Sequence, residues 1–567
     1  MTDKPHVIIP RRKFVKSAGA TAAALGMATA SSEAFSFWNW RHRYRSPRFS
    51  DAFRLRRALS RRRQEVYNFR RDLAADEFRR GVVIPTPNSD EDTLTTYIGN
   101  FTKTLPHDEL GLVTPSAYDS LVTAMESGEP SDFAAIPLAP EADRKLANPQ
   151  AALAFTQVGG DSHSFSMPAA PAFSSAWEAS EMGEVYLHAV LRDVEFDEYG
   201  SSAAVTRAVG QMNEFSDFRG PKQGGQVTAQ TLFRGETAGD LVGNYISQFL
   251  LLPITESGTT REQLYPAPIQ AFDHMVSYSD WLNVLRGGAP TTSTSFDPNP
   301  RYITTGRDLA EFVHTDYSYQ AYLQAALILA GLGTPAQTNN PYLNIANQGA
   351  FVTFGGAEIL TTVANVALLA LKASWYHKWS VHRRVRPEVF SGHVHNNKIG
   401  ETTHPVSDEL MNSSILDDVF ALIDTQTSGS GTYLLPMAYP EGSPTHPAYP
   451  AGHAGIAGAC VTVLKAFYNE DAVISSPVEV TPGSNGTELR AYTGGEVLTV
   501  GNELNKLANN VSLGRDIAGV HWRTDGTEGM LLGEQVAISY LKEQKKTYNE
   551  GSFNLEFTGF GGNSITI

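Results

Sequence analysis

Cysteine is almost absent from this sequence of 567 residues, since Cys460 is the only one. A single cysteine excludes an internal disulfide bond. Cys460 lies in an apolar run with helical character, and we interpret it as a buried structural thiol. The length of the chain, its 41% hydrophobic content and its 10% aromatic content are sufficient for a large hydrophobic core.

A positive charge balance is lacking from most of the chain. Residues 1–80 contain 19 Lys and Arg against 7 Asp and Glu, whereas residues 81–567 contain 26 against 53. We call residues 81–567 the acidic body. Its negative charge balance argues against nucleic acid as the main partner. An anionic cofactor in such a body would require a local concentration of cationic side chains.

The sequence also lacks repeats of the solenoid type and a long apolar run near its N-terminus. The apolar run 18–30 is too short and too rich in alanine to span a membrane stably. Because Arg11 and Arg12 precede it, residues 1–34 resemble a twin-arginine signal peptide. We therefore expect a periplasmic or secreted protein.

One longer apolar stretch, residues 351–371, has Glu358 as its only charge. We interpret it as a core helix of a bundle because Lys378 follows directly on the same helix, with a membrane span as the alternative. The sequence thus predicts no stable membrane span.

Elsewhere the apolar positions predict a mainly α protein, with helical bundles around one anion site and small β hairpins near the C-terminus. The stretch 287–300, rich in Pro, Gly, Ser and Thr, predicts a boundary between an N-terminal helical region, 35–290, and a C-terminal helical region, 291–567, unless both form one continuous domain, 35–567. The expected helices cover Ser116–Met125, Ala176–Leu191, Ala203–Phe215, Ala238–Leu252, Ile269–Leu285, Leu309–Ala330 and Val352–Tyr376, and the expected hairpins cover 476–500 and 552–567.

A basic segment, residues 41–80, contains fourteen arginines interspersed with apolar side chains. We interpret it as a helix whose arginines face a partner subunit or the acidic body. A basic arm for nucleic acid or a membrane surface is the alternative.

Near the C-terminus, Arg515, His521 and Asp525 follow one another at spacings of six and four. Residues four apart share a helix face, so we expect Asp525 to bond one ring nitrogen of His521 and leave the other free as a ligand. Arg515 cannot share that face, and we expect it to come from the preceding turn, where Gly514 helps the chain to bend. This pattern suits a tetrahedral oxyanion, with a surface ion pair and a buried histidine as the alternative.

Two further segments carry suitable groups. Lys378 and Arg386 lie eight apart, about two helical turns, and Pro387 predicts that the helix ends at Arg386, unless this basic run is only a solvated helix face. In the other segment, Pro450-Ala-Gly-His453 leads into a helix-like run, 454–468. A helix N-terminus is an anion site, and His453 could exchange protons with the anion's ligands.

Together the three segments resemble the signature of the vanadium-dependent haloperoxidases and the related acid phosphatases, which is a lysine before Arg-Pro, then Pro-Ser-Gly-His, then Ser-Arg-x-x-x-Gly-x-His-x-x-x-Asp. The eight-residue spacing of Lys378 and Arg386, and His446 seven residues before His453, resemble the red-algal bromoperoxidase branch. The likeness extends through most of the chain after Arg70, including 97–107 and 148–155.

The resemblance implies that His521 binds the metal of a vanadate cofactor and that Asp525 orients the ring. It implies that His453 exchanges protons with hydrogen peroxide, and that a halide, bromide or iodide, is oxidised to hypohalous acid. It also implies a homo-oligomer. The groups that it assigns to the vanadate oxygens are Lys378, which would also polarise the peroxide, with Arg386, Arg515 and the backbone N–H of Gly452.

Two positions depart from the family pattern. Ala451 replaces a serine and cannot supply a hydroxyl, which should cost about 1–3 kcal/mol of cofactor or transition-state stabilisation. We expect His446 to compensate in part by hydrogen bonding near His453, with a turn-capping loop histidine as the alternative. Gly514 replaces the serine before the arginine.

Two other functions fit the same residues. A phosphomonoesterase would hold phosphate in this pocket and use His521 as its nucleophile. A non-enzymatic anion-binding protein, made inactive by Ala451, would bind vanadate without turnover. The long N-terminal half and the spacing of Lys378 and Arg386 favour the haloperoxidase.

Overall fold

The computed structural model of this chain describes residues 49–256 and 258–567. The expected signal peptide, residues 1–34, lies outside the described residues. The chain divides into two compact units, Met1–Val83 with Thr255–Thr259, and Ile84–Ile254 with Thr260–Ile567. The second unit runs across position 290, and the domain boundary expected there stays a prediction.

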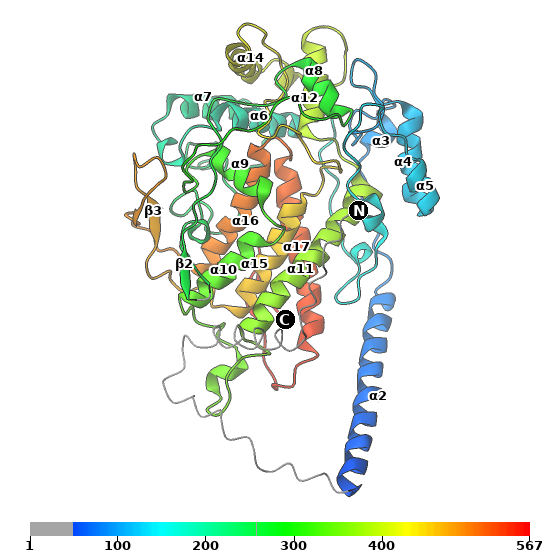
Figure 1. The fold of residues 1–567 in the computed structure, drawn as a ribbon, viewed down its shortest axis with the longest axis vertical. Coiled ribbons are helices and arrows are strands. Elements are labelled where there is room, and N and C mark those ends of the chain that lie inside the picture. The colour runs from blue at the N-terminus through cyan, green and yellow to red at the C-terminus, as the bar shows by residue number, and fades with distance from the viewer. Residues whose placement is uncertain (1–48, 257) are drawn as a thin grey trace, which may run out of the picture. The chain divides into compact units, whose positions relative to one another are not determined.

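The described part of the first unit is dominated by one long helix, α2 (Phe49–Arg79), the blue helix in Figure 1. Arginine, alanine, leucine and glutamate are good helix formers, and α2 has no glycine or proline within its 31 residues. The helix predicted for the basic segment is therefore confirmed.

The second unit is mainly helical, as predicted, and each sheet of the described residues contains two short strands. Its helices are α3 (Asp90–Thr93), α4 (Pro115–Ser127), α5 (Pro130–Ala135), α6 (Ala176–Leu191), α7 (Ala203–Met212), α8 (Tyr278–Leu285), α9 (Gly306–Thr315), α10 (Gln320–Gly331), α11 (Gly356–Tyr376), α12 (Pro387–Lys398), α13 (Asp408–Met411), α14 (Ile415–Gln426), α15 (Gly452–Phe467), α16 (Val500–Ile517) and α17 (Arg523–Lys545). Shorter 3₁₀ turns are η1 (Pro149–Leu153), η2 (Ser162–Ser164), η3 (Phe196–Glu198), η4 (Gln248–Leu250) and η5 (Pro341–Asn344), and η6 (His377–His382) is a π-helical turn. The strands pair as β1 (Ile254–Glu256) with β2 (Thr259–Arg261), β3 (Val478–Val480) with β4 (Leu489–Ala491), and β5 (Glu556–Thr558) with β6 (Ser564–Thr566).

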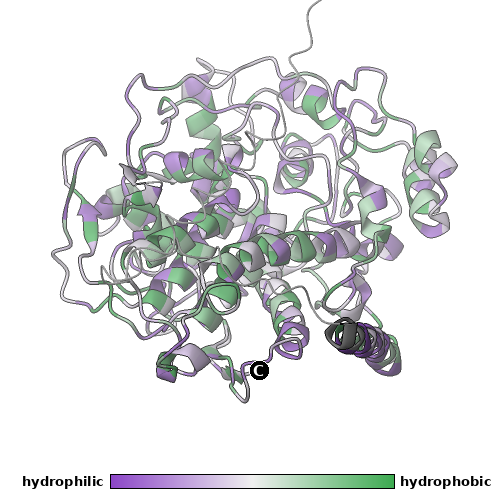
Figure 2. Ribbon diagram, turned by 60° about the horizontal axis from the view of Figure 1, so that its bottom comes forward, coloured by the Kyte–Doolittle hydropathy of each residue, from purple (hydrophilic) through white to green (hydrophobic). Residues whose placement is uncertain are grey.

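The bundle at the centre of this unit consists of α11, α15, α16 and α17, which lie side by side in Figure 1. Helix α15 is almost entirely buried, because it is apolar on every side. Its contact with α17 is unusually close. A methyl group on Gly458 would overlap the carbonyl oxygen of Met530, and one on Gly533 would overlap that of Gly455. Figure 2 shows that individual helices carry both hydrophobic and hydrophilic residues along their length.

Three expected helices were wrong in extent. Residues 238–252 form turns and the short η4, because Gly239 and Gly243 adopt positive φ. In the segment 269–285 a helix begins only at α8, because Ser277 caps it by accepting a hydrogen bond from the Asp280 N–H. The segment 309–330 is split into α9 and α10.

Other predictions are confirmed. Helices form within 116–125, 176–191, 203–215 and 352–376, and antiparallel hairpins form within 476–500 and 552–567. Cys460 is buried, and its thiol lies 3.4 Å from the carbonyl oxygen of Val363. In the part of the chain described, the segment Gly356–His382 is long and apolar enough to cross a membrane, and it packs against α15 and α17 as part of the bundle.

Candidate active site

The three sequence segments meet at one end of the central bundle. Lys378 lies on η6, directly after α11, and Arg386 immediately precedes α12. Gly452 begins α15, Arg515 lies in the last turn of α16, and His521 stands two residues before α17. Residues at or beside the ends of five helical elements therefore form the site, and no single element carries all of them.

The Asp525 carboxylate bonds the His521 ring, as predicted, but the two residues do not lie on one helix. Its Nδ1 lies 2.7 Å from Oδ2 of Asp525, and the same oxygen accepts a hydrogen bond from the Trp522 N–H at 3.2 Å. His521 thus lies outside α17, and Asp525 caps that helix while it bonds the ring. The expectation that both residues share a helix face was wrong, although the hydrogen bond it predicted is present. Nε2 is left to face the site.

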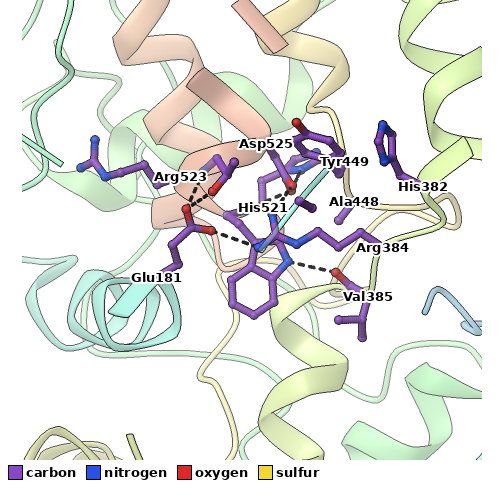
Figure 3. A network of polar contacts seen from close by, with 12 residues as sticks. Glu181, His382, Arg384, Val385, Ala448, Tyr449, His521, Arg523 and Asp525 are labelled. Carbon is purple, nitrogen blue, oxygen red and sulfur yellow. Dashed lines mark hydrogen bonds and ion pairs between the residues drawn. The ribbon is translucent and has the colours of Figure 1, made fainter. Parts of the chain in front are cut away.

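A buried ion-pair network fixes the other side of Asp525 (Figure 3). Arg384 donates from Nη1 to Oδ1 of Asp525 at 2.9 Å and pairs through Nη2 with Glu178 and Glu181 on α6. Arg523, next in sequence to Trp522, pairs with Glu184 on the same helix. This network holds the His521 ring in one orientation.

The sequence interpretation missed this network. Its signal was present in α6, where three glutamates at spacings of three lie in an otherwise apolar helix. Arg384 belongs to the basic run between Lys378 and Arg386, for which a solvated face was the alternative. All three cations are buried, so that alternative was wrong.

Three buried cations, Lys378, Arg386 and Arg515, have no carboxylate partner within the described residues, and their charges act on His521. Arg386 Nη1 lies 3.0 Å from His521 Nε2, and the Arg386 guanidinium also donates to the carbonyls of Val520 and His446. Lys378 Nζ donates to the carbonyl oxygens of Pro447 and Ala448 at 2.7 and 2.8 Å. Neither Arg386 nor Lys378 forms an ion pair within the described residues.

Burial and mutual repulsion disfavour the charged forms of these side chains, and a bound anion would stabilise them. Burial, followed by the charges of Arg386 and Arg515, holds the pKa of Lys378 well below its usual value, although Asp525 opposes this. Burial and Arg515 lower the pKa of Arg386 to about 9, again against Asp525. Burial and the same cations hold the pKa of His521 well below its usual range, so the ring is neutral and can act as a ligand.

Arg515 completes the cluster, but not from a turn. It lies within α16, so the expected bend at Gly514 was wrong. Gly514 instead allows close packing, because a methyl group there would lie 3.0 Å from a methyl carbon of Val313. Arg515 Nη1 donates to the Val313 carbonyl at 2.7 Å, and its buried Nε has no partner within the described residues. That unsatisfied N–H is a donor available to a bound anion.

His453 and Asp316 form a pair beside the cations. His453 Nε2 lies 3.0 Å from Asp316 Oδ1, and the imidazole is 25% exposed while the Asp316 carboxylate is 4% exposed. His453 is therefore a member of the site that solvent can reach. Asp316 follows α9 directly, so the break between α9 and α10 places this carboxylate.

His446 lies against Arg386. Its Nδ1 is 3.0 Å from Arg386 Nη2, and its ring is 4.6 Å from that of Trp375, centroid to centroid. The structure gives it this partner in place of one near His453. Burial, with the charges of Lys378 and Arg386, lowers its pKa well below the usual range, so it is a neutral hydrogen-bonding group.

Ala451 and Gly452 form the N-terminus of α15. Ala451 is buried, its N–H donates to the Asp525 carbonyl at 2.9 Å, and it supplies no side-chain cap to the helix. Gly452 is the first residue of this helix, where a backbone N–H has no partner within the helix. The helix dipole adds to the positive field of the cations.

The donor set fits an oxyanion. Within residues 49–256 and 258–567, no group of three or more His, Cys, Asp or Glu could hold a metal cation. The site offers two guanidinium groups, one ammonium group, a neutral imidazole nitrogen and a helix N-terminus. A tetrahedral or five-coordinate oxyanion such as vanadate or phosphate satisfies this combination.

Comparison with known proteins agrees with this geometry. A family model described as the VCPO second helical-bundle domain matches residues 358–550, which include all the cations of the site. The chain is 34% identical to a vanadium-dependent bromoperoxidase from Corallina pilulifera, covering 90% of this chain and 99% of the relative. It is 36% identical to one from Ascophyllum nodosum, covering 82% and 86%.

A solved structure extends the likeness to the fold. The homohexameric second vanadate-dependent bromoperoxidase of Ascophyllum nodosum superposes with a TM-score of 0.85 at 30% identity, covering 96% of this chain and 95% of that one. Identity and coverage of this order over almost the whole chain show that it belongs to the vanadium-dependent haloperoxidase family.

Proposed function

We propose that this protein oxidises bromide or iodide with hydrogen peroxide to hypohalous acid, using vanadate held at His521. The observation that carries the proposal is the buried cluster of Lys378, Arg386 and Arg515 around a neutral imidazole nitrogen. Such a cluster is costly in an empty site and is stabilised by a bound oxyanion. The names of the relatives point to vanadate as that oxyanion.

The residues divide the work as follows. His521 Nε2 would be the ligand for vanadium, and Asp525 with Arg384 fixes its tautomer. The cations and the α15 N-terminus bind the oxygens. Vanadate, when bound, supplies a Lewis-acidic centre that makes peroxide electrophilic toward a halide without a change of oxidation state. The protein thus provides electrostatic preorganisation and proton transfer.

His453 is the proton-transfer group in this proposal. Solvent can reach its imidazole, which is 25% exposed, and the Asp316 carboxylate holds its Nε2. It would accept a proton from hydrogen peroxide that enters the site and donate that proton again later in the cycle. Lys378 would polarise the peroxide oxygen, and two backbone carbonyls hold its ammonium group.

A halide-oxidation assay tests the proposal. Apo and vanadate-loaded protein are compared with iodide, bromide and chloride, and the apo protein is also assayed with p-nitrophenyl phosphate. We expect bromide or iodide oxidation only after loading. Phosphate-ester hydrolysis without halide oxidation would identify a phosphomonoesterase, which the named relatives do not favour. Tight vanadate binding without either activity would identify an inactive relative.

We also propose export by the twin-arginine route and assembly into a homo-oligomer. Arg11 and Arg12 before the alanine-rich run support export, and the protein would then be periplasmic or secreted. The homohexameric relative supports assembly. Mass spectrometry of the mature N-terminus tests the first, and light scattering of the purified protein tests the second.

A further inference from the structure

Helix α2 carries a narrow apolar stripe. Leu55, Leu59, Val66, Phe69 and Leu73 follow one another at multiples of three and four residues, which places them within about 80° of one another around the helix. The first three are 56%, 58% and 37% exposed. A stripe of this width is the seam by which a helix packs on a partner.

The flanks of the stripe are basic. Residues 54–71 contain eight arginines and one acidic residue, Glu65. Residues 81–567 contain twice as many acidic as basic side chains, 53 against 26. Helix and body are therefore complementary in charge, and a surface of each would attract the other.

Pairing of α2 with another α2 is disfavoured. Arg62 occupies the stripe between Leu59 and Val66, so a symmetric helix pair would bring guanidinium groups together at its centre. The arginines on both flanks would add to this repulsion. The acidic body of a second copy satisfies these arginines, and it leaves the apolar stripe free to bury its leucines.

We propose that α2 is the assembly arm of the homo-oligomer, docking its apolar stripe and flanking arginines on the acidic body of a second copy. The inference rests on the homo-oligomer proposed above and assigns the surface that forms it.

Two variants of the full-length, vanadate-loaded protein test the arm. The first, Leu55→Asp with Leu59→Asp and Val66→Asp, removes the stripe. The matched control, Ser60→Asp with Gln64→Asp and Asn68→Asp, adds the same charge to the opposite side of the helix. Sedimentation velocity at low and high salt gives the assembly state of each. Circular dichroism and halide oxidation per subunit report folding and the active site.

We expect an oligomer for the wild type and the control. The stripe variant should dissociate, with a subunit dissociation constant raised by roughly tenfold or more, and with helix content and activity unchanged. High salt should weaken the wild-type assembly, because it screens the arginines. A stripe variant that assembles like the wild type would overturn the assignment of α2 alone. A wild type that is monomeric would overturn the homo-oligomer itself.

The same proteins are mixed with vesicles containing anionic phospholipid and with duplex DNA. The docking proposal expects the assembled wild type to bind neither, because its arginines are already paired. Tight binding of either probe through the stripe, with assembly unaffected by the stripe variant, would show that α2 serves a membrane or nucleic acid instead.

Discussion

At the scale of single residues, the chemistry depends on whether each buried charge has a partner. Arg384 is the clearest example, because it neutralises Glu178, Glu181 and Asp525 at once. We expect Arg384→Met to lower the free energy of unfolding by about 3–5 kcal/mol, since it leaves buried carboxylates without a cation. Urea unfolding measures this. Arg219→Met is the control, because the Arg219–Asp217 pair is exposed and should change stability by less than about 1 kcal/mol.

Ala451 offers a test in the opposite direction. Ala451→Ser restores the hydroxyl of the family pattern at the start of α15, and we expect it to strengthen vanadate binding by about 1–3 kcal/mol. Titration of the apo protein with vanadate measures the dissociation constant. A serine that only capped the helix would raise the thermal stability of the apo protein and leave vanadate affinity unchanged.

His314 provides a prediction on pH. Burial alone would lower its pKa, but hydrogen bonds to Glu311 and Glu441 raise it to about 9. A pKa raised above the unfolded value of about 6.5 stabilises the fold fully below that pH, and the contribution is lost as pH rises through 9. The difference in unfolding free energy between the wild type and His314→Gln should therefore shrink between pH 7 and 10. A difference independent of pH would contradict this protonation.

His314 also bears on the site. Its ring stacks on Tyr439 at 3.8 Å, and the Tyr439 hydroxyl lies 3.3 Å from Arg515 Nη1. Loss of the positive charge of His314 should therefore weaken the packing of Tyr439 beside Arg515.

At the scale of elements, the close contact between α15 and α17 positions the anion site. Gly452 begins α15 and His521 lies just before α17, so the separation of the two helices sets the distance between these parts of the site. We expect Gly458→Ala to force the two helices apart and to destabilise the protein by about 1–3 kcal/mol or more. Thermal unfolding measures the loss. Gly210→Ala in α7 is the control, since a methyl group there meets no atom within 4 Å and favours the helix.

At the scale of the whole molecule, a bound oxyanion should stabilise the fold. In the proposed function, vanadate binds only where Lys378, Arg386 and Arg515 have converged, and their segments separate on unfolding. At a vanadate concentration one hundred times the dissociation constant, the unfolding free energy should rise by about 2.7 kcal/mol. Differential scanning calorimetry with and without vanadate tests this. The shift should vanish in His521→Ala, and an equal shift in that variant would place the binding elsewhere.

The sequence by itself determined the helical class, the α2 helix, the two C-terminal hairpins and the types of residue that meet at the site. These follow from local information, because apolar periodicity reports which side of a segment is buried, and motif spacing fixes which donors are available. The hydrogen bond from His521 to Asp525 was predictable because it spans only four residues.

Only the tertiary structure decided the rest. Arg384 meets Glu178 across 206 positions, and His446 meets Arg386 across 60, so no local pattern records either pair. The break after α9 serves Asp316, whose partner His453 lies 137 positions away. Burial of these charges depends on which distant segments surround them. A charged side chain can stay in the interior only when such segments supply its partner.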